Sequence, residues 1–94
     1  MMQKRNNGKP VLEAEAVVHW VDPVNRELAA LVEGVPVTIY VPPDCEVVLR
    51  GERVKLRMVQ PRDRLRVAYT ELADSLVARA IEVQPAYPSP SLSQ

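Results

Sequence analysis

A chain of 94 residues, 47% of them hydrophobic, is long enough for one small domain, and its formal net charge is zero. It contains no apolar run near the length that crosses a bilayer, which excludes membrane insertion by a helix. Its single cysteine, Cys45, excludes an intrachain disulfide and a zinc site framed by cysteines. The basic start of the chain lacks the apolar segment of a signal peptide, so we expect a cytoplasmic location.

The charges are segregated along the chain although they cancel overall. Residues 11–49 carry seven acidic residues and one arginine, whereas residues 50–66 carry seven basic residues and two acidic ones. Such segments can neutralise each other across neighbouring strands, or the basic one can present a stripe to an anionic partner.

The first alternating run covers residues 11–18 and turns Glu13 and Glu15 outward. The phase then slips, so that His19 and Trp20 occupy the space of one residue, which predicts a β-bulge. Residues 22–25, with the sequence DPVN, predict a type I turn.

Three shorter runs follow. Residues 27–32 and 36–41 alternate and are joined by a tight turn at Glu33 and Gly34. Pro42 and Pro43 end the second of these runs because neither can donate a ladder hydrogen bond. Residues 47–49 predict a short fourth strand, which a turn at residues 50–51 connects to the basic segment.

Residues 53–69 carry the most regular pattern of the chain, two alternating arms joined by a proline turn. The inward positions are Val54, Leu56 and Met58 in the first arm and Leu65, Val67 and Tyr69 in the second. The pattern predicts a β-hairpin whose outer face is basic, with Arg53, Lys55, Arg57, Arg64 and Arg66. Residues 57–60 fit either the strand or a short helical turn.

The end of the chain predicts one more strand and a tail. Residues 71–75 form a polar loop, and residues 76–83 form the last strand, in which the spacing from Ala78 to Ile81 predicts a second bulge. We therefore expect a flexible basic arm at residues 1–10, a β-barrel domain at 11–84 and a disordered tail rich in proline and serine at 85–94.

Six or seven short strands without helical periodicity predict an all-β fold. We expect a small closed antiparallel barrel, OB-like or SH3-like, because two bulges supply curvature and closure removes exposed strand edges.

Several segments resemble a group of small bacterial β-barrel domains of unknown function. These segments are AVVHWVD at residues 16–22, PRDRLRVAY at residues 61–69 and LVARAIEV at residues 76–83, where the group has GxVxxVD, PGDxVxVxY and LxAxxIxV. The resemblance implies an OB-like or SH3-like barrel and occurrence in exported proteins, and it implies no catalytic residue. Arg62 replaces a glycine of the group, which predicts a type I turn because type II needs a positive φ.

The residues that carry chemistry are few. His19 and Cys45 are the only soft ligands that we identify, and no spacing links them, so we expect no metal site and no cofactor. Glu13 and Glu15 are both expected on the solvent-exposed face of one strand. A general acid and a general base need different environments to separate their pKa values, and these two carboxylates have the same one. We therefore expect no enzyme.

Two functions remain, and both are binding functions. Trp20 and Tyr40 predict a module for protein interaction or self-association if Trp20 is exposed with Val17, Leu31 or Tyr40 rather than plugging a barrel end. The alternative is single-stranded nucleic-acid binding by the basic hairpin, residues 53–66. That alternative fails if Glu13 and Glu15 lie opposite Arg64 and Arg66 and neutralise them.

Overall fold

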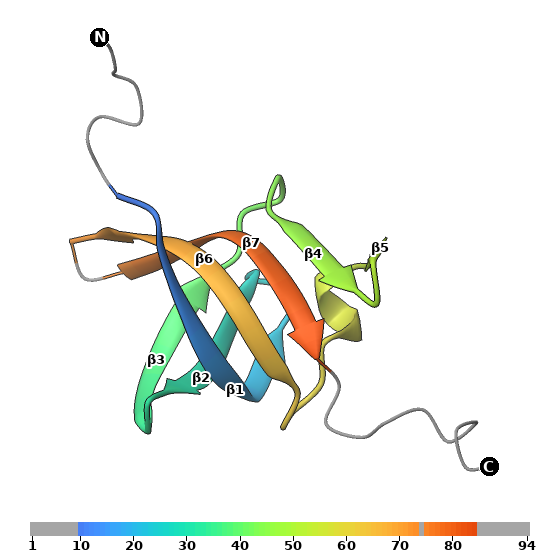
Figure 1. Cartoon of the computed structure of the whole chain (residues 1–94), viewed down its shortest axis with the longest axis horizontal. Coiled ribbons are helices and arrows are strands. Elements are labelled where there is room, and N and C mark those ends of the chain that lie inside the picture. The colour runs from blue at the N-terminus through green and yellow to red at the C-terminus, as the bar shows by residue number, and fades with distance from the viewer. Residues whose placement is uncertain (1–9, 74, 85–94) are drawn as a thin grey trace, which may run out of the picture.

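Seven β-strands and one 3-10 helix make up the computed structural model, which describes residues 10–73 and 75–84 (Figure 1). The strands are β1 (Leu12–Asp22), β2 (Glu27–Val32), β3 (Val35–Tyr40), β4 (Glu46–Leu49), β5 (Glu52–Arg53), β6 (Arg64–Leu72) and β7 (Ser75–Gln84). The 3-10 helix, η1, covers Leu56–Met58. The predicted all-β class is confirmed.

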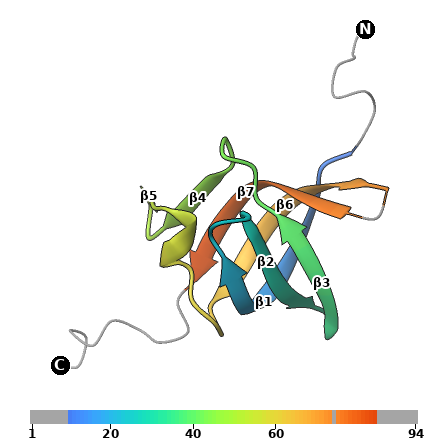
Figure 2. The same ribbon diagram turned by 180° about the vertical axis from the view of Figure 1, so that it is seen from behind.

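Five of these strands close into a barrel in the order β3-β2-β1-β6-β7. Neighbours in this order are antiparallel, and the barrel closes through a short parallel contact that pairs Ile39 with Leu76 and Tyr40 with Val77. Strand β4 pairs in parallel with β7, and β5 pairs with β4, so these two strands lie outside the barrel (Figures 1 and 2). The predicted closed barrel is confirmed.

Both predicted bulges are present. Val18 pairs with Ala30 and Trp20 with Ala29, so His19 is the extra residue of β1. On β7, Ala80 pairs with Ala68 of β6 and Ala78 pairs with the next residue, Tyr69. Arg79 is therefore the extra residue of β7. A bulge bends its strand and strengthens the local twist, which lets short strands curve into a barrel.

The core follows the alternation of the sequence. The largest fully buried side chains are Leu28, Ile39, Val41, Leu65, Val67 and Ile81. All six stand at positions that the alternating patterns place inward. Because the period of a strand is two, burial of these residues fixes the register of each strand and leaves the residues between them on the outer surface.

The predicted basic hairpin is wrong in its first arm. Strand β5 ends at Arg53 and pairs with β4, and the chain then forms η1, while β6 pairs with β1 and β7. Leu56 and Val59 are both buried, and residues three apart lie on one side of a 3-10 helix. Met58, expected inward, is 51% exposed. The helical alternative for residues 57–60 therefore applies in part.

The turns carry left-handed residues where the hairpins need them. Glu33 and Gly34 have φ values of 52° and 81°, and Arg50 and Gly51 have 54° and 82°, as a type I′ turn requires. At the DPVN turn the Asp22 carboxylate accepts hydrogen bonds from the backbone N–H groups of residues 24 and 25, both at 3.1 Å. The predicted polar loop at 71–75 is shorter, because β6 extends to Leu72.

The turn at Pro61 differs from its predicted type. The Asp63 N–H donates to the Gln60 carbonyl at 3.1 Å, which closes a β-turn, and Arg62 has a φ of 76°. A positive φ at the third residue belongs to a type II turn. The type I prediction is therefore wrong, and Arg62 adopts a left-handed conformation.

The predicted arm at residues 1–10 and tail at 85–94 lie outside the described residues, apart from Pro10. No helix within residues 10–73 and 75–84 is long and apolar enough to cross a membrane.

Glycine at position 62 should stabilise the fold relative to alanine. Arg62→Gly and Arg62→Ala both remove the side chain, but only glycine adopts a positive φ without a steric cost. We expect the glycine variant to be more stable by roughly 1 kcal/mol in urea unfolding. Equal unfolding free energies for the two variants would contradict a left-handed residue at this turn.

Candidate functional site

The outer face of β6 carries two of the five basic residues singled out from the sequence. Arg66 stands opposite Glu15 of β1 and Glu82 of β7, and its Nη2 lies 3.8 Å from Glu15 Oε2. The predicted neutralisation is thus confirmed for Glu15. It is wrong for Glu13, which lies opposite Ala68, and Arg64 lies opposite Val17. An exposed ion pair of this kind adds roughly 0–1 kcal/mol of stability.

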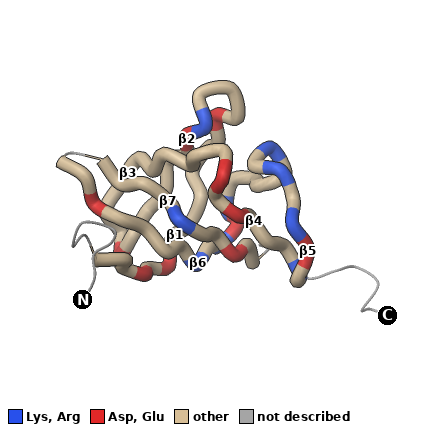
Figure 3. Tube along the Cα trace, turned by 90° about the horizontal axis from the view of Figure 1, so that it is seen from above, with Lys and Arg blue, Asp and Glu red and all other residues tan. Residues whose placement is uncertain are grey.

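The other three basic residues lie elsewhere, at one end of the barrel. Arg53, Lys55 and Arg57 line a pocket of about 390 Å³ together with Arg26 from the turn after β1. We call it the basic pocket. Figure 3 shows the lysine and arginine colour gathered on the chain around β5. The predicted continuous basic face is therefore wrong, because η1 interrupts the alternation that would have aligned the two arms.

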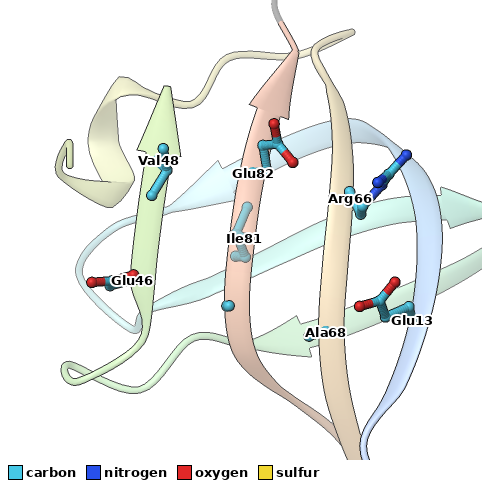
Figure 4. Close-up of a pocket in the computed structure, with 8 residues that line it drawn as sticks. Glu13, Glu46, Val48, Arg66, Ala68, Ile81 and Glu82 are labelled. Carbon is cyan, nitrogen blue, oxygen red and sulfur yellow. The ribbon is translucent and has the colours of Figure 1, made fainter. Parts of the chain in front are cut away.

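A second hollow, of about 270 Å³, lies on the outer surface of β1, β6, β7 and β4 (Figure 4). Its charged residues are Glu13, Glu46, Glu82 and Arg66, and the small side chains of Ala68 and Ala80 leave the space between them. Nowhere in residues 10–73 and 75–84 do three His, Cys, Asp or Glu side chains gather in a way that could hold a metal ion. This hollow is therefore a mixed-charge surface without a metal cluster.

Several large apolar side chains on β1, β2 and β3 are exposed. Val17, Trp20, Leu31 and Tyr40 are exposed to 38%, 44%, 41% and 40%, and Val17 stands directly opposite Leu31. Figure 2 shows the three strands side by side. Trp20 is therefore an exposed side chain and not a buried plug of a barrel end.

Among residues 10–73 and 75–84, the soft metal donors are His19, Cys45 and Met58. His19 is exposed at the bulge of β1, and Met58 is exposed on η1, which contacts β1. The turn that follows η1 is hydrogen-bonded to β1. The Arg62 N–H donates to the carbonyl of Val18, the residue before the bulge, at 2.8 Å. Met58 was not predicted as a donor, because the alternation of residues 53–58 places it in the core.

Cys45 differs from these two donors because it is buried, with 7% exposure. Burial and the neighbouring Asp44 carboxylate raise the pKa of its thiol to about 11, against the lowering effect of Arg26 and Arg79. A thiol with such a pKa is protonated at neutral pH and is a poor nucleophile and a poor metal ligand.

Comparison with known proteins finds similarity at the level of structure. No family model matches the chain, and no curated protein matches its sequence. The fold is similar to the crystal structure of Ag(I)CusF, with a TM-score of 0.65 and 11% identity over 80% of this chain and 99% of that one. It is also similar to silver-bound CusF from Escherichia coli, with a TM-score of 0.63 and 11% identity over 81% and 94% of the two chains.

A copper(II) complex of a tryptophan-to-alanine variant of CusF from Escherichia coli matches with a TM-score of 0.62 and 11% identity, over 88% of this chain and 99% of that one. These similarities establish the fold. They overturn the predicted roles in protein interaction or self-association and in nucleic-acid binding, because the solved structures that share this barrel are CusF, which holds silver or copper in three of them.

The buried thiol should make stability depend on pH in the alkaline range. The folded state raises the pKa of Cys45 from 9.0 to about 11, so unfolding releases a proton between these values and stability falls as the pH rises through them. We expect the unfolding free energy of the wild type to fall relative to Cys45→Ala by at most about 1.4 kcal/mol per pH unit, the limit for one proton. Parallel pH profiles of the two proteins would contradict this.

Proposed function

We propose that the chain is a non-enzymatic binder of a soft monovalent metal ion, silver(I) or copper(I). The observation that carries the proposal is the exposure of two soft donors, His19 and Met58, on two contacting elements of a barrel whose structural relatives hold silver and copper. Thioether and imidazole ligands suit such ions, and the absence of a carboxylate or thiolate cluster in the described residues argues against harder divalent ions.

The local fold supports His19 as the first ligand. Its position is the extra residue of the bulge, without a partner in the register of β2. Bulges often re-aim a side chain near a functional site. The next residue, Trp20, is the only tryptophan of the chain and is 44% exposed, so its ring can add a cation–π contact to a bound cation.

Met58 is the second proposed ligand, and the 3-10 helix presents it. Leu56 and Val59 anchor the segment in the core, which leaves Met58 between them on the outside. Cys45 is not a ligand in this proposal, because its thiol is buried and protonated. The expected cytoplasmic location gains no support from the structure.

Silver(I) titration of the full chain tests the proposal, with tryptophan fluorescence as a local readout and calorimetry for affinity. We expect one equivalent to bind and to quench Trp20. His19→Gln and Met58→Leu should each weaken binding by about tenfold or more, the scale of losing a metal-site interaction. Met2→Leu makes the same substitution at a methionine that the proposal does not assign as a ligand, and it is the matched control.

Three results would overturn the site. They are binding that Met2→Leu weakens as much as Met58→Leu does, binding that survives in the double variant His19→Gln/Met58→Leu, and binding that Cys45→Ala abolishes.

A further inference from the structure

The basic pocket is a strongly charged concave surface, and the proposed metal site does not use it. Four cationic side chains line it, Arg26, Arg53, Lys55 and Arg57, and no aspartate or glutamate does. Walls of one charge sign with apolar surroundings focus the electrostatic potential and attract a counter-ion. The pocket therefore has the electrostatics of an anion site.

Arg26 is held in place by the fold. Its Nε donates to the Val41 carbonyl at 2.7 Å and its Nη2 to the Pro42 carbonyl at 3.3 Å, while its own carbonyl accepts from the Val41 N–H at 2.8 Å. A guanidinium carries five N–H donors, so these two side-chain bonds leave donors for a ligand. Such a group loses little freedom on binding, which favours affinity.

The opposite wall comes from β5 and η1. The Val54 N–H donates to the Val47 carbonyl at 2.8 Å, and Leu56 is buried, so the segment with the three cations is tied to β4 and the core. The Glu46 carboxylate competes at the rim, since Arg53 Nε lies 3.7 Å from Glu46 Oε2 in an exposed pair, and Asp44 neighbours the lining residue Cys45. A contact of that length and exposure is weak.

The remaining lining is largely apolar. It consists of Pro23, Pro43, Cys45, Val47, Val54 and Leu56. A volume of about 390 Å³ lies in the range of small-molecule sites and exceeds the need of an inorganic ion. The ligand should therefore carry both a compact negative charge and an apolar part.

We propose that the basic pocket binds a small phosphate monoester with an apolar organic group. A phosphate monoester carries a charge of about −1.5 to −2 at neutral pH, and arginine binds it through paired hydrogen bonds. The prolines and aliphatic side chains face the organic group. Arg64 and Arg66 lie outside this pocket, so the cations form one concave site and not a track along a polymer.

Titration with phenyl phosphate tests this proposal, with inorganic phosphate as the second probe and ¹⁵N chemical shifts as the readout. We expect saturable binding of phenyl phosphate, with shifts at the Arg26 Nε–Hε group and along residues 53–57, and weaker binding of inorganic phosphate. Lys55→Gln and Arg57→Gln should each raise the dissociation constant roughly tenfold, the scale of one charged hydrogen bond.

Arg64→Gln is the matched control, because it removes the same charge outside the pocket and should change the dissociation constant by less than about twofold at fixed salt. An equal effect of Arg64→Gln would mean that only the general charge acts, and this would overturn the site. No saturable binding of phenyl phosphate would also overturn it. Equal affinity for inorganic phosphate would overturn the role of the apolar wall.

Discussion

The closing contact of the barrel is the constraint on which the rest of the structure depends. Only two residue pairs join β3 to β7, and they occupy the start of β7 at Leu76 and Val77. The same edge of β7 then accepts β4 from Ala80 to Val83, and the bulge residue Arg79 lies between the two contacts. Because a bulge bends its strand, the start of β7 can pair with β3 in the barrel, and the part after Arg79 can pair with the outer strand β4.

The last residues of β1 lie next to the 3-10 helix. Strand β1 pairs with β6 from Leu12 to Val17 and with β2 from Ala16 to Asp22, so its last residues leave an open edge towards η1. The 3-10 helix covers the barrel there with Leu56 and Val59. Within η1, the Met58 N–H donates to the Lys55 carbonyl at 2.8 Å and the Val59 N–H to the Leu56 carbonyl at 3.0 Å.

The distribution of charge and of soft donors follows from this arrangement. The cations of residues 53–57 leave the sheet with η1 and meet Arg26 at the end of the barrel, whereas Arg66 stays on β6 between Glu15 and Glu82. Met58 becomes exposed on the same helix that contacts the strand of His19. One local departure from strand geometry thus creates the basic pocket and presents the thioether.

Local patterns determined much of this protein. The alternation in residues 11–18 and 27–32, the two bulges and the glycine turns are set by neighbours in the chain, because a strand has a period of two and a left-handed turn favours few residues. Contacts between distant residues decided what remained. The register placed Glu15 rather than Glu13 beside an arginine, the pocket joined Arg26 to residues 53–57, and burial of Leu56 and Val59 outweighed the alternation around Met58. Spacing along a chain does not encode which strands become neighbours, and only the closed barrel selected those partners.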